Sequence, residues 1–144
     1  MKRTTLILTA CLLSAFQSIA AEGWLTNIEK GQEQAKKEGK LLFVEFTGSD
    51  WCPPCIALKK KVLSTEEFAK FAKESLVLVE IDFPRKKTLD EAQRKYNDSQ
   101  SKKYKLDGVP MVLVFDASGK QVLKDVGFGG ESVTEYIAKL KALK

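Results

Sequence analysis

Two cysteines separated by two prolines, Cys52-Pro53-Pro54-Cys55, are the residues of this chain whose types and spacing could do chemistry. They follow a strand-like apolar run and begin a helix-like run. The first turn of a helix offers N–H groups without intrahelical partners and a partial positive charge. A cysteine placed there has its pKa lowered, to roughly 3.5–7.5 in such sites, and the thiolate is the form that exchanges disulfides. We therefore expect Cys52 to be a nucleophile and Cys55, one helical turn later, to attack a mixed disulfide formed at Cys52.

The two prolines fit this junction between a strand and a helix. A proline at the first helical position is preset in φ, and the N–H that it lacks would have had no helical partner. Pro53 and Pro54 also stiffen the loop between the cysteines and remove two possible hydrogen-bond donors to the Cys52 sulfur.

The composition of the chain excludes several other kinds of site. The chain has 144 residues, of which 44% are hydrophobic and 30% charged, and this is typical of one globular domain with a sizeable core. It contains no histidine, which excludes a Cys–His nucleophile pair and a Cys₂His₂ zinc site. We expect neither a metal nor a cofactor beyond the two thiols.

Residues 1–20 have the pattern of a secretory signal peptide. Lys2 and Arg3 precede an apolar stretch over 6–16, and small residues lead to a predicted cleavage after Ala20. The stretch is too short to span a membrane. We therefore expect a signal peptide at 1–20, a folded domain at 21–144, a periplasmic or otherwise exported location, and no stable membrane insertion after cleavage. A lipoprotein signal before Cys11 is the alternative, but its apolar run would be unusually short.

The predicted mature domain keeps two of the three cysteines, Cys52 and Cys55. A disulfide between them would close a very small loop, which constrains the unfolded chain little, so a redox role explains the spacing better than a structural one. Without Lys2 and Arg3, the 24 Lys and Arg become 22 against 19 Asp and Glu, a net charge of +3. This charge is too small to argue for a nucleic-acid partner.

Capping signals and apolar periodicity predict alternating helices and strands. The segment 83–87, Phe-Pro-Arg-Lys-Lys, reads as a basic turn, either a solvated loop or a docking patch for an acidic partner. The expected elements are a helix over 23–40, a strand over 41–47, helices over 52–63 and 64–73, a strand over 76–82, a helix over 88–104, a hairpin of 111–116 and 121–128, and a last helix from Ser132.

Three features together resemble the thioredoxin superfamily: the Cys-x-x-Cys after a strand, the preceding Trp51, and the later Gly108-Val109-Pro110. The string over 46–52 is most similar to small exported bacterial members of that superfamily. The resemblance runs from about Leu41 to the C-terminus. It implies a thioredoxin-like α/β fold whose four-stranded mixed sheet, flanked by helices, has the order second, first, third, fourth. No additional N-terminal strand is expected.

The resemblance also implies roles for individual residues. Cys52 would be the exposed nucleophile and Cys55 the more buried resolving thiol, and the two would form the Cys52–Cys55 disulfide when oxidised. Pro110 matches the cis-proline that faces the dithiol in this superfamily, whereas an ordinary trans proline before a strand is the alternative. The residues expected to contact substrate are Trp51, Pro53, Pro54, Val109, whose backbone would pair with an extended substrate, and Gly127, which would leave room for it.

Glu45 interrupts the apolar strand and matches the buried acid of the superfamily, although Glu replaces Asp and one more residue separates it from Cys52. Burial would raise its pKa and make it a candidate proton acceptor for Cys55. A carboxylate at a strand edge paired with a lysine is the alternative. The lysine that the superfamily carries in the second strand is replaced here by Leu78.

These expectations combine into a periplasmic thiol:disulfide oxidoreductase that exchanges disulfides with cysteine-containing exported proteins. We favour a reductase, because the chain has neither the inserted domain of strong oxidants nor the dimerisation domain of isomerases. A reductase in an oxidising compartment would need an electron donor, such as a membrane thiol relay. The alternatives are a non-catalytic binding module that uses the groove at Val109 and Pro110, and a dithiol metal carrier.

Overall fold

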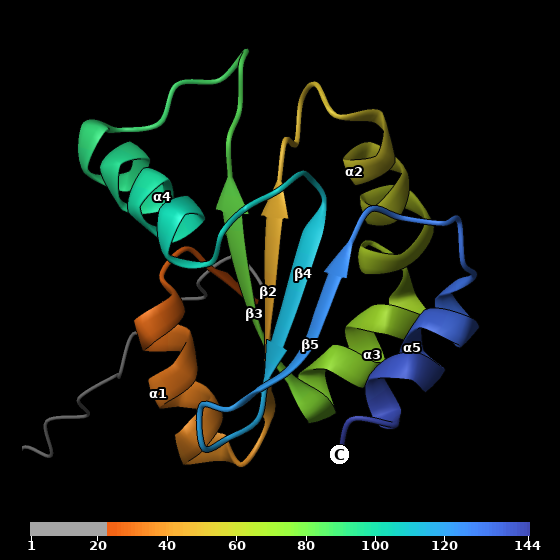
Figure 1. Ribbon diagram of the computed structural model, residues 1–144. Helices are drawn as coiled ribbons and strands as arrows, with labels where there is room; N and C mark the ends of the chain where they lie inside the picture. Colours follow the sequence, from red (N-terminus) through yellow and green to blue (C-terminus); the bar gives the residue numbers. More distant parts are fainter. Residues whose placement is uncertain (1–22) are drawn as a thin grey trace, which may run out of the picture.

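The computed structural model describes residues 23–144 (Figure 1). The signal peptide predicted at 1–20 and its cleavage site therefore lie outside the described residues. Within 23–144, none of the helices has both the length and the apolar composition that crossing a bilayer requires.

A mixed sheet with the strand order β1-β3-β2-β4-β5 forms the middle of the domain. The central strand β2 (Leu41–Thr47) is parallel to β3 (Leu76–Asp82) and antiparallel to β4 (Met111–Phe115), which in turn is antiparallel to β5 (Gln121–Val126). All seven residues of β2 are buried, and this explains its almost continuous apolar sequence. The predicted order of these four strands is confirmed.

The expectation of four strands without an N-terminal addition is wrong, because a short strand β1 (Trp24–Leu25) pairs in parallel with β3. The helix predicted over 23–40 begins only after this strand. A strand of two residues has no periodicity that the sequence could reveal. The Trp24 ring packs edge-on against Phe43, with 6.0 Å between ring centroids, and this contact holds the strand to the core. Helix α1 (Ile28–Glu38) begins after Asn27, whose side chain accepts the Lys30 N–H at 2.8 Å.

Helices cover both faces of the sheet (Figure 1). On one face lie α1 and α4 (Glu91–Lys103), and on the other lie α2 (Pro53–Leu58), its π-helical continuation η1 (Lys59–Leu63), α3 (Glu66–Ser75) and α5 (Val133–Lys141). Two apolar clusters divide the core in the same way, one including Leu58, Phe68 and Tyr136 and the other including Ile28 and Ala35.

Candidate active site

The two cysteines of the motif form a disulfide at the start of α2. Cys52 is the N-cap residue with an extended backbone, and its sulfur lies 3.3 Å from the backbone nitrogen of Cys55, whose N–H it accepts. Pro53 and Pro54 occupy the first two helical positions and are exposed. In the reduced protein this geometry would present an unpaired helical N–H and the positive end of the helix to the Cys52 sulfur, which favours a thiolate.

The expectation that Cys52 is exposed is wrong for this oxidised state. Only 3% of Cys52 and 1% of Cys55 is accessible to solvent. The cover comes from a distant segment, because the Cys52 sulfur lies 3.6 Å from the carbonyl oxygen of Val109. A substrate must therefore reach the sulfur beside Val109 rather than across an open surface.

The segment that covers Cys52 contains a cis peptide bond between Val109 and Pro110. Pro110 is buried, and its carbonyl oxygen accepts the N–H of Gly127 at 2.8 Å. Gly127 is exposed, has a φ of +90° and has open space where a side chain would begin. The structure thus brings Val109, Pro110 and Gly127 together with the dithiol, although 57 residues separate Cys52 from Val109.

Glu45 is a buried acid without a hydrogen-bond partner. It is 1% exposed, and neither carboxylate oxygen has a partner within the described residues. It follows Phe43 by two positions on β2 and therefore lies on the sheet face covered by α2, the helix that carries Cys55. Burial, reinforced by the Glu80 carboxylate, raises the pKa of Glu45 to about 8. The alternative of a strand-edge carboxylate paired with a lysine is wrong, because β2 is the central strand and the side chain is unpaired.

Sequence reasoning missed two charged neighbours of Glu45. Glu80 is its register partner on β3, and Lys59, one turn after Cys55, binds Glu80 with 3.2 Å between Nζ and Oε1. Lys59 acts against the rise in the Glu45 pKa. The sequence does place one glutamate in each of the two predicted strands, Glu45 and Glu80. That they face each other can be recognised only once the register of the two strands is known.

Trp51 is fixed by the chain that follows β3. Its indole N–H donates to the carbonyl oxygen of Phe83 at 2.7 Å, and the Arg85 guanidinium lies over the ring, 3.8 Å from the centroid. The backbone of Gly48 also lies against the ring, because a Cβ there would come within 2.5 Å of it. Trp51 therefore forms a rigid wall next to Cys52.

Asp50 links the loop before Cys52 to the segment that follows β3. Its carboxylate accepts the backbone N–H groups of Arg85 at 2.9 Å, Lys86 at 2.8 Å and Lys87 at 3.2 Å. These hydrogen bonds, that of Arg85 first, hold the pKa of Asp50 below its ordinary value. Ser49 adds a second link through Asp82, to which its hydroxyl donates at 2.6 Å.

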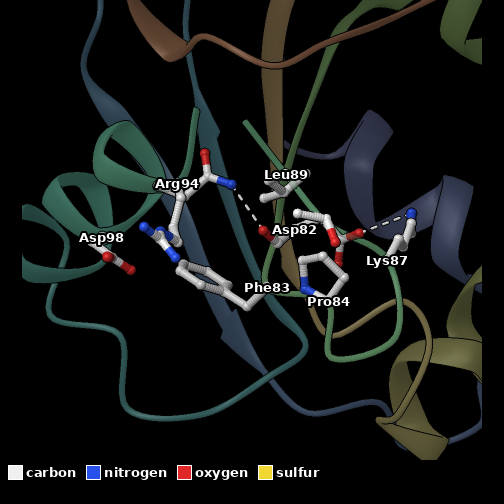
Figure 2. A pocket seen from close by; sticks show the side chains of 9 residues that line it. Asp82, Phe83, Pro84, Lys87, Leu89, Arg94 and Asp98 are labelled. Atoms are coloured by element: carbon white, nitrogen blue, oxygen red, sulfur yellow. Dashed lines mark hydrogen bonds and ion pairs between the residues drawn. The ribbon is translucent and has the colours of Figure 1, made fainter. Parts of the chain in front are cut away.

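A pocket of about 300 Å³ lies between the end of β3 and α4 (Figure 2). Asp82 bridges it, with its carboxylate paired to Lys87 at 3.1 Å and its carbonyl oxygen accepting an amide N–H of Asn97 at 2.8 Å. Neither cysteine lines this pocket, so the chemistry of the dithiol takes place outside it. The lining residues are Asp82, Phe83, Pro84, Lys87, Thr88, Leu89, Arg94, Asn97 and Asp98.

Among residues 23–144, no group of three or more His, Cys, Asp and Glu side chains is arranged to hold a metal ion. The site at the dithiol consists of a sulfur at a helix start, a second sulfur beside it, a buried carboxyl group on the same side of the sheet, and a backbone edge at Val109.

Comparisons with known proteins agree with this geometry. A family model described as thioredoxin-like matches residues 23–117. The disulfide bond reductase DsbH of Chlamydia pneumoniae is 38% identical over 110 residues, 76% of this chain and 66% of that protein. The thioredoxin-related protein DsbJ of the same organism is 27% identical over 109 residues, 76% of this chain and 31% of that protein. The match thus spans just under two thirds of one curated relative and about a third of the other.

A solved structure of a DsbH oxidoreductase is 33% identical, covers 94% of both chains and superposes with a TM-score of 0.75. The predicted thioredoxin-like fold is thereby confirmed. Because the family model spans well over half of the sequence, this chain belongs to the thioredoxin-like family.

Proposed function

We propose that the protein is an exported thiol–disulfide oxidoreductase that reduces disulfides in other exported proteins. The observation that carries the proposal is the Cys52–Cys55 pair at the start of α2, with the backbone of Val109 against the Cys52 sulfur. The names of two relatives, a disulfide bond reductase and an oxidoreductase, support the class of reaction.

In the proposed cycle the Cys52 thiolate attacks one sulfur of a substrate disulfide. A Cys52–substrate disulfide forms, and the other substrate sulfur leaves as a thiolate. The Cys55 thiol then loses its proton and attacks the Cys52 sulfur, which forms the Cys52–Cys55 disulfide and releases the second substrate thiolate. The substrate gains two electrons and the protein loses two, so no cofactor is consumed.

Glu45 is the proposed acceptor of the Cys55 proton. It lies on the sheet face beneath α2, and its oxygens have no competing hydrogen bond within the described residues. A carboxyl group with a pKa near 8 takes up and releases a proton close to neutral pH, which suits a base that acts once in each cycle.

Substrate recognition is proposed for the surface that surrounds Cys52. The backbone of Val109 lies outside the strands, and an extended substrate segment can pair with it as an added strand. Pro53 and Pro54 on one side and the open Gly127 on the other would border this segment, and Trp51 would form its wall. Ile56, which follows Cys55, and Val126, which precedes Gly127, are exposed apolar side chains that would extend this border.

The direction and place of the reaction are part of the proposal. The similarity to the disulfide bond reductase DsbH favours reduction, and the predicted signal peptide at 1–20 favours a periplasmic location. A reductase outside the cytoplasm must be reduced again after every cycle. A membrane thiol relay is the proposed donor.

Insulin reduction by dithiothreitol tests the proposal. The wild type should accelerate precipitation of the reduced chains, whereas Cys52→Ser should give the rate of dithiothreitol alone. Equal activity in both proteins would contradict the enzyme proposal and favour a binding module. Metal bound after purification under reducing conditions would favour the metal carrier instead.

A further inference from the structure

The segment 83–87, called the basic turn below, is held rigidly beside the dithiol. Asp50 accepts three of its backbone N–H groups, and Trp51 donates to the carbonyl oxygen of Phe83. In Figure 1 the loop after β3 and the loop between β2 and α2 lie at the same end of the sheet. The turn therefore has a fixed place next to the residue that precedes Cys52.

Two cations of the basic turn, Arg85 and Lys86, form no ion pair with a carboxylate of the described residues. Asp50 is occupied by backbone N–H groups, and Asp82 pairs with Lys87 at 3.1 Å. Arg85 and Lys86 are exposed, and neither side chain makes an ion pair with any residue of 23–144. The basic turn thus carries three cations, Arg85, Lys86 and Lys87, against the two adjacent carboxylates of Asp50 and Asp82, so positive charge is in excess there.

Arg85 is also preorganised. Its guanidinium lies 3.8 Å from the centroid of the Trp51 ring, so stacking limits the conformations of a side chain that would otherwise be flexible. A stacked guanidinium keeps the N–H groups at its edge, which match the two oxygens of a carboxylate. A fixed Arg binds such a group at a lower entropic cost than a mobile Lys.

From these contacts we propose that Arg85, supported by Lys86, is a docking site for acidic side chains next to the target cysteine of the substrate. This inference rests on the proposed function and adds a substrate class to it. Because Val109 contacts the Cys52 sulfur and Trp51 directly precedes Cys52, a substrate segment laid along Val109 would lie close to Trp51, and a carboxylate near its cysteine would meet the guanidinium that covers the ring.

Matched peptide substrates test this. Each is Gly-X-Cys-X-Gly with blocked ends, its sulfur joined to thionitrobenzoate, and X is Glu, Gln or Lys. Attack by Cys52 of the reduced protein forms a peptide–Cys52 disulfide and releases coloured thionitrobenzoate, so stopped-flow absorbance gives the rate. An exposed ion pair predicts that the wild type reacts about two- to fivefold faster with the Glu peptide than with the Gln peptide, and more slowly with the Lys peptide.

The preference for Glu should disappear in Arg85→Gln and at high salt, because screening weakens exposed charge pairs. It should persist in Lys120→Gln, which removes the same charge from the turn between β4 and β5, at the other end of the sheet (Figure 1). Arg85→Lys, which keeps the charge but not the planar fork, should retain part of it. The ratio of two peptides in one protein is insensitive to the fraction of protein that is folded.

Equal rates for the three peptides in the wild type, or an equal Glu-to-Gln ratio in the wild type and Arg85→Gln, would overturn the inference. Failure of the proposed function looks different, because the wild type would then react no faster than Cys52→Ser with every peptide.

Discussion

Glu45 and Glu80 lie opposite each other on β2 and β3, and of the two only Glu80 reaches a cation within the described residues. Lys59 binds Glu80 at 3.2 Å from the helix that carries Cys55. Glu45 therefore has another acid, Glu80, as its register partner, and the cation Lys59 is bound to Glu80 rather than to Glu45. Burial is the main reason that the pKa of Glu45 is raised, and the charges of Glu80 and Lys59 adjust that pKa in opposite directions.

Substitution of these neighbours should move the Glu45 pKa in opposite directions. Glu80→Gln removes a repulsive charge and should lower it, whereas Lys59→Met removes an attractive charge and should raise it. Carbon NMR of the labelled Glu45 carboxyl group measures both shifts. Lys60→Met is the matched control, because Lys60 is exposed and makes no ion pair within 23–144. Shifts of the same sign in both variants would refute the proposed arrangement.

Glu45 should also make stability depend on pH. Its pKa is raised from 4.5 to about 8 in the folded protein, so folding favours the protonated form. The resulting stabilisation is present in full below pH 4.5 and is lost as the pH rises through 8, with a slope of at most about 1.4 kcal/mol per pH unit in that window. Urea unfolding at a series of pH values measures it. Glu45→Gln should flatten this part of the curve, and an unchanged slope would exclude a buried titrating group.

The two cysteines should differ when each is replaced in cells. In Cys55→Ser the second step cannot occur, so mixed disulfides at Cys52 should accumulate. In Cys52→Ser they should be nearly absent, because the nucleophile is missing. Non-reducing gels after acid quenching measure the adducts, and mass spectrometry identifies the attached proteins. Accumulation in Cys52→Ser instead would reverse the assigned roles.

Gly48 should be sensitive to even one added methyl group. A Cβ there would meet the Trp51 ring at 2.5 Å, so Gly48→Ala must displace the indole and should lower the free energy of unfolding by about 1–3 kcal/mol. Gly108→Ala is the control, because its Cβ would find only an ordinary contact with Val126 at 3.8 Å. Thermal unfolding together with tryptophan fluorescence measures both effects. A stable Gly48→Ala protein with unchanged fluorescence would show that Trp51 is not held as described.

Local signals explain what could be predicted from the sequence. The apolar run of β2 and the cysteines that follow it are contiguous, so the strand, the helix start and the dithiol were readable from neighbouring residues. Strand β1 has only two residues and gave no pattern. The burial of Cys52 and the link from Asp50 to Arg85 depend on segments 57 and 35 residues away along the chain. The pairing of Lys59 with Glu80 depends on the register of two strands. Such contacts follow from the assembled fold rather than from any local pattern.

The acidity of Cys52 in the reduced protein tests the account most directly. Two effects compete: the helix start favours the thiolate, and the cover from Val109 favours the neutral thiol. We expect the rate of iodoacetamide alkylation of Cys52, measured against pH in the Cys55→Ser protein, to give a pKa well below the value of about 8.5 for free cysteine. A pKa at or above that value would contradict the central claim that the fold keeps Cys52 as a reactive thiolate near neutral pH.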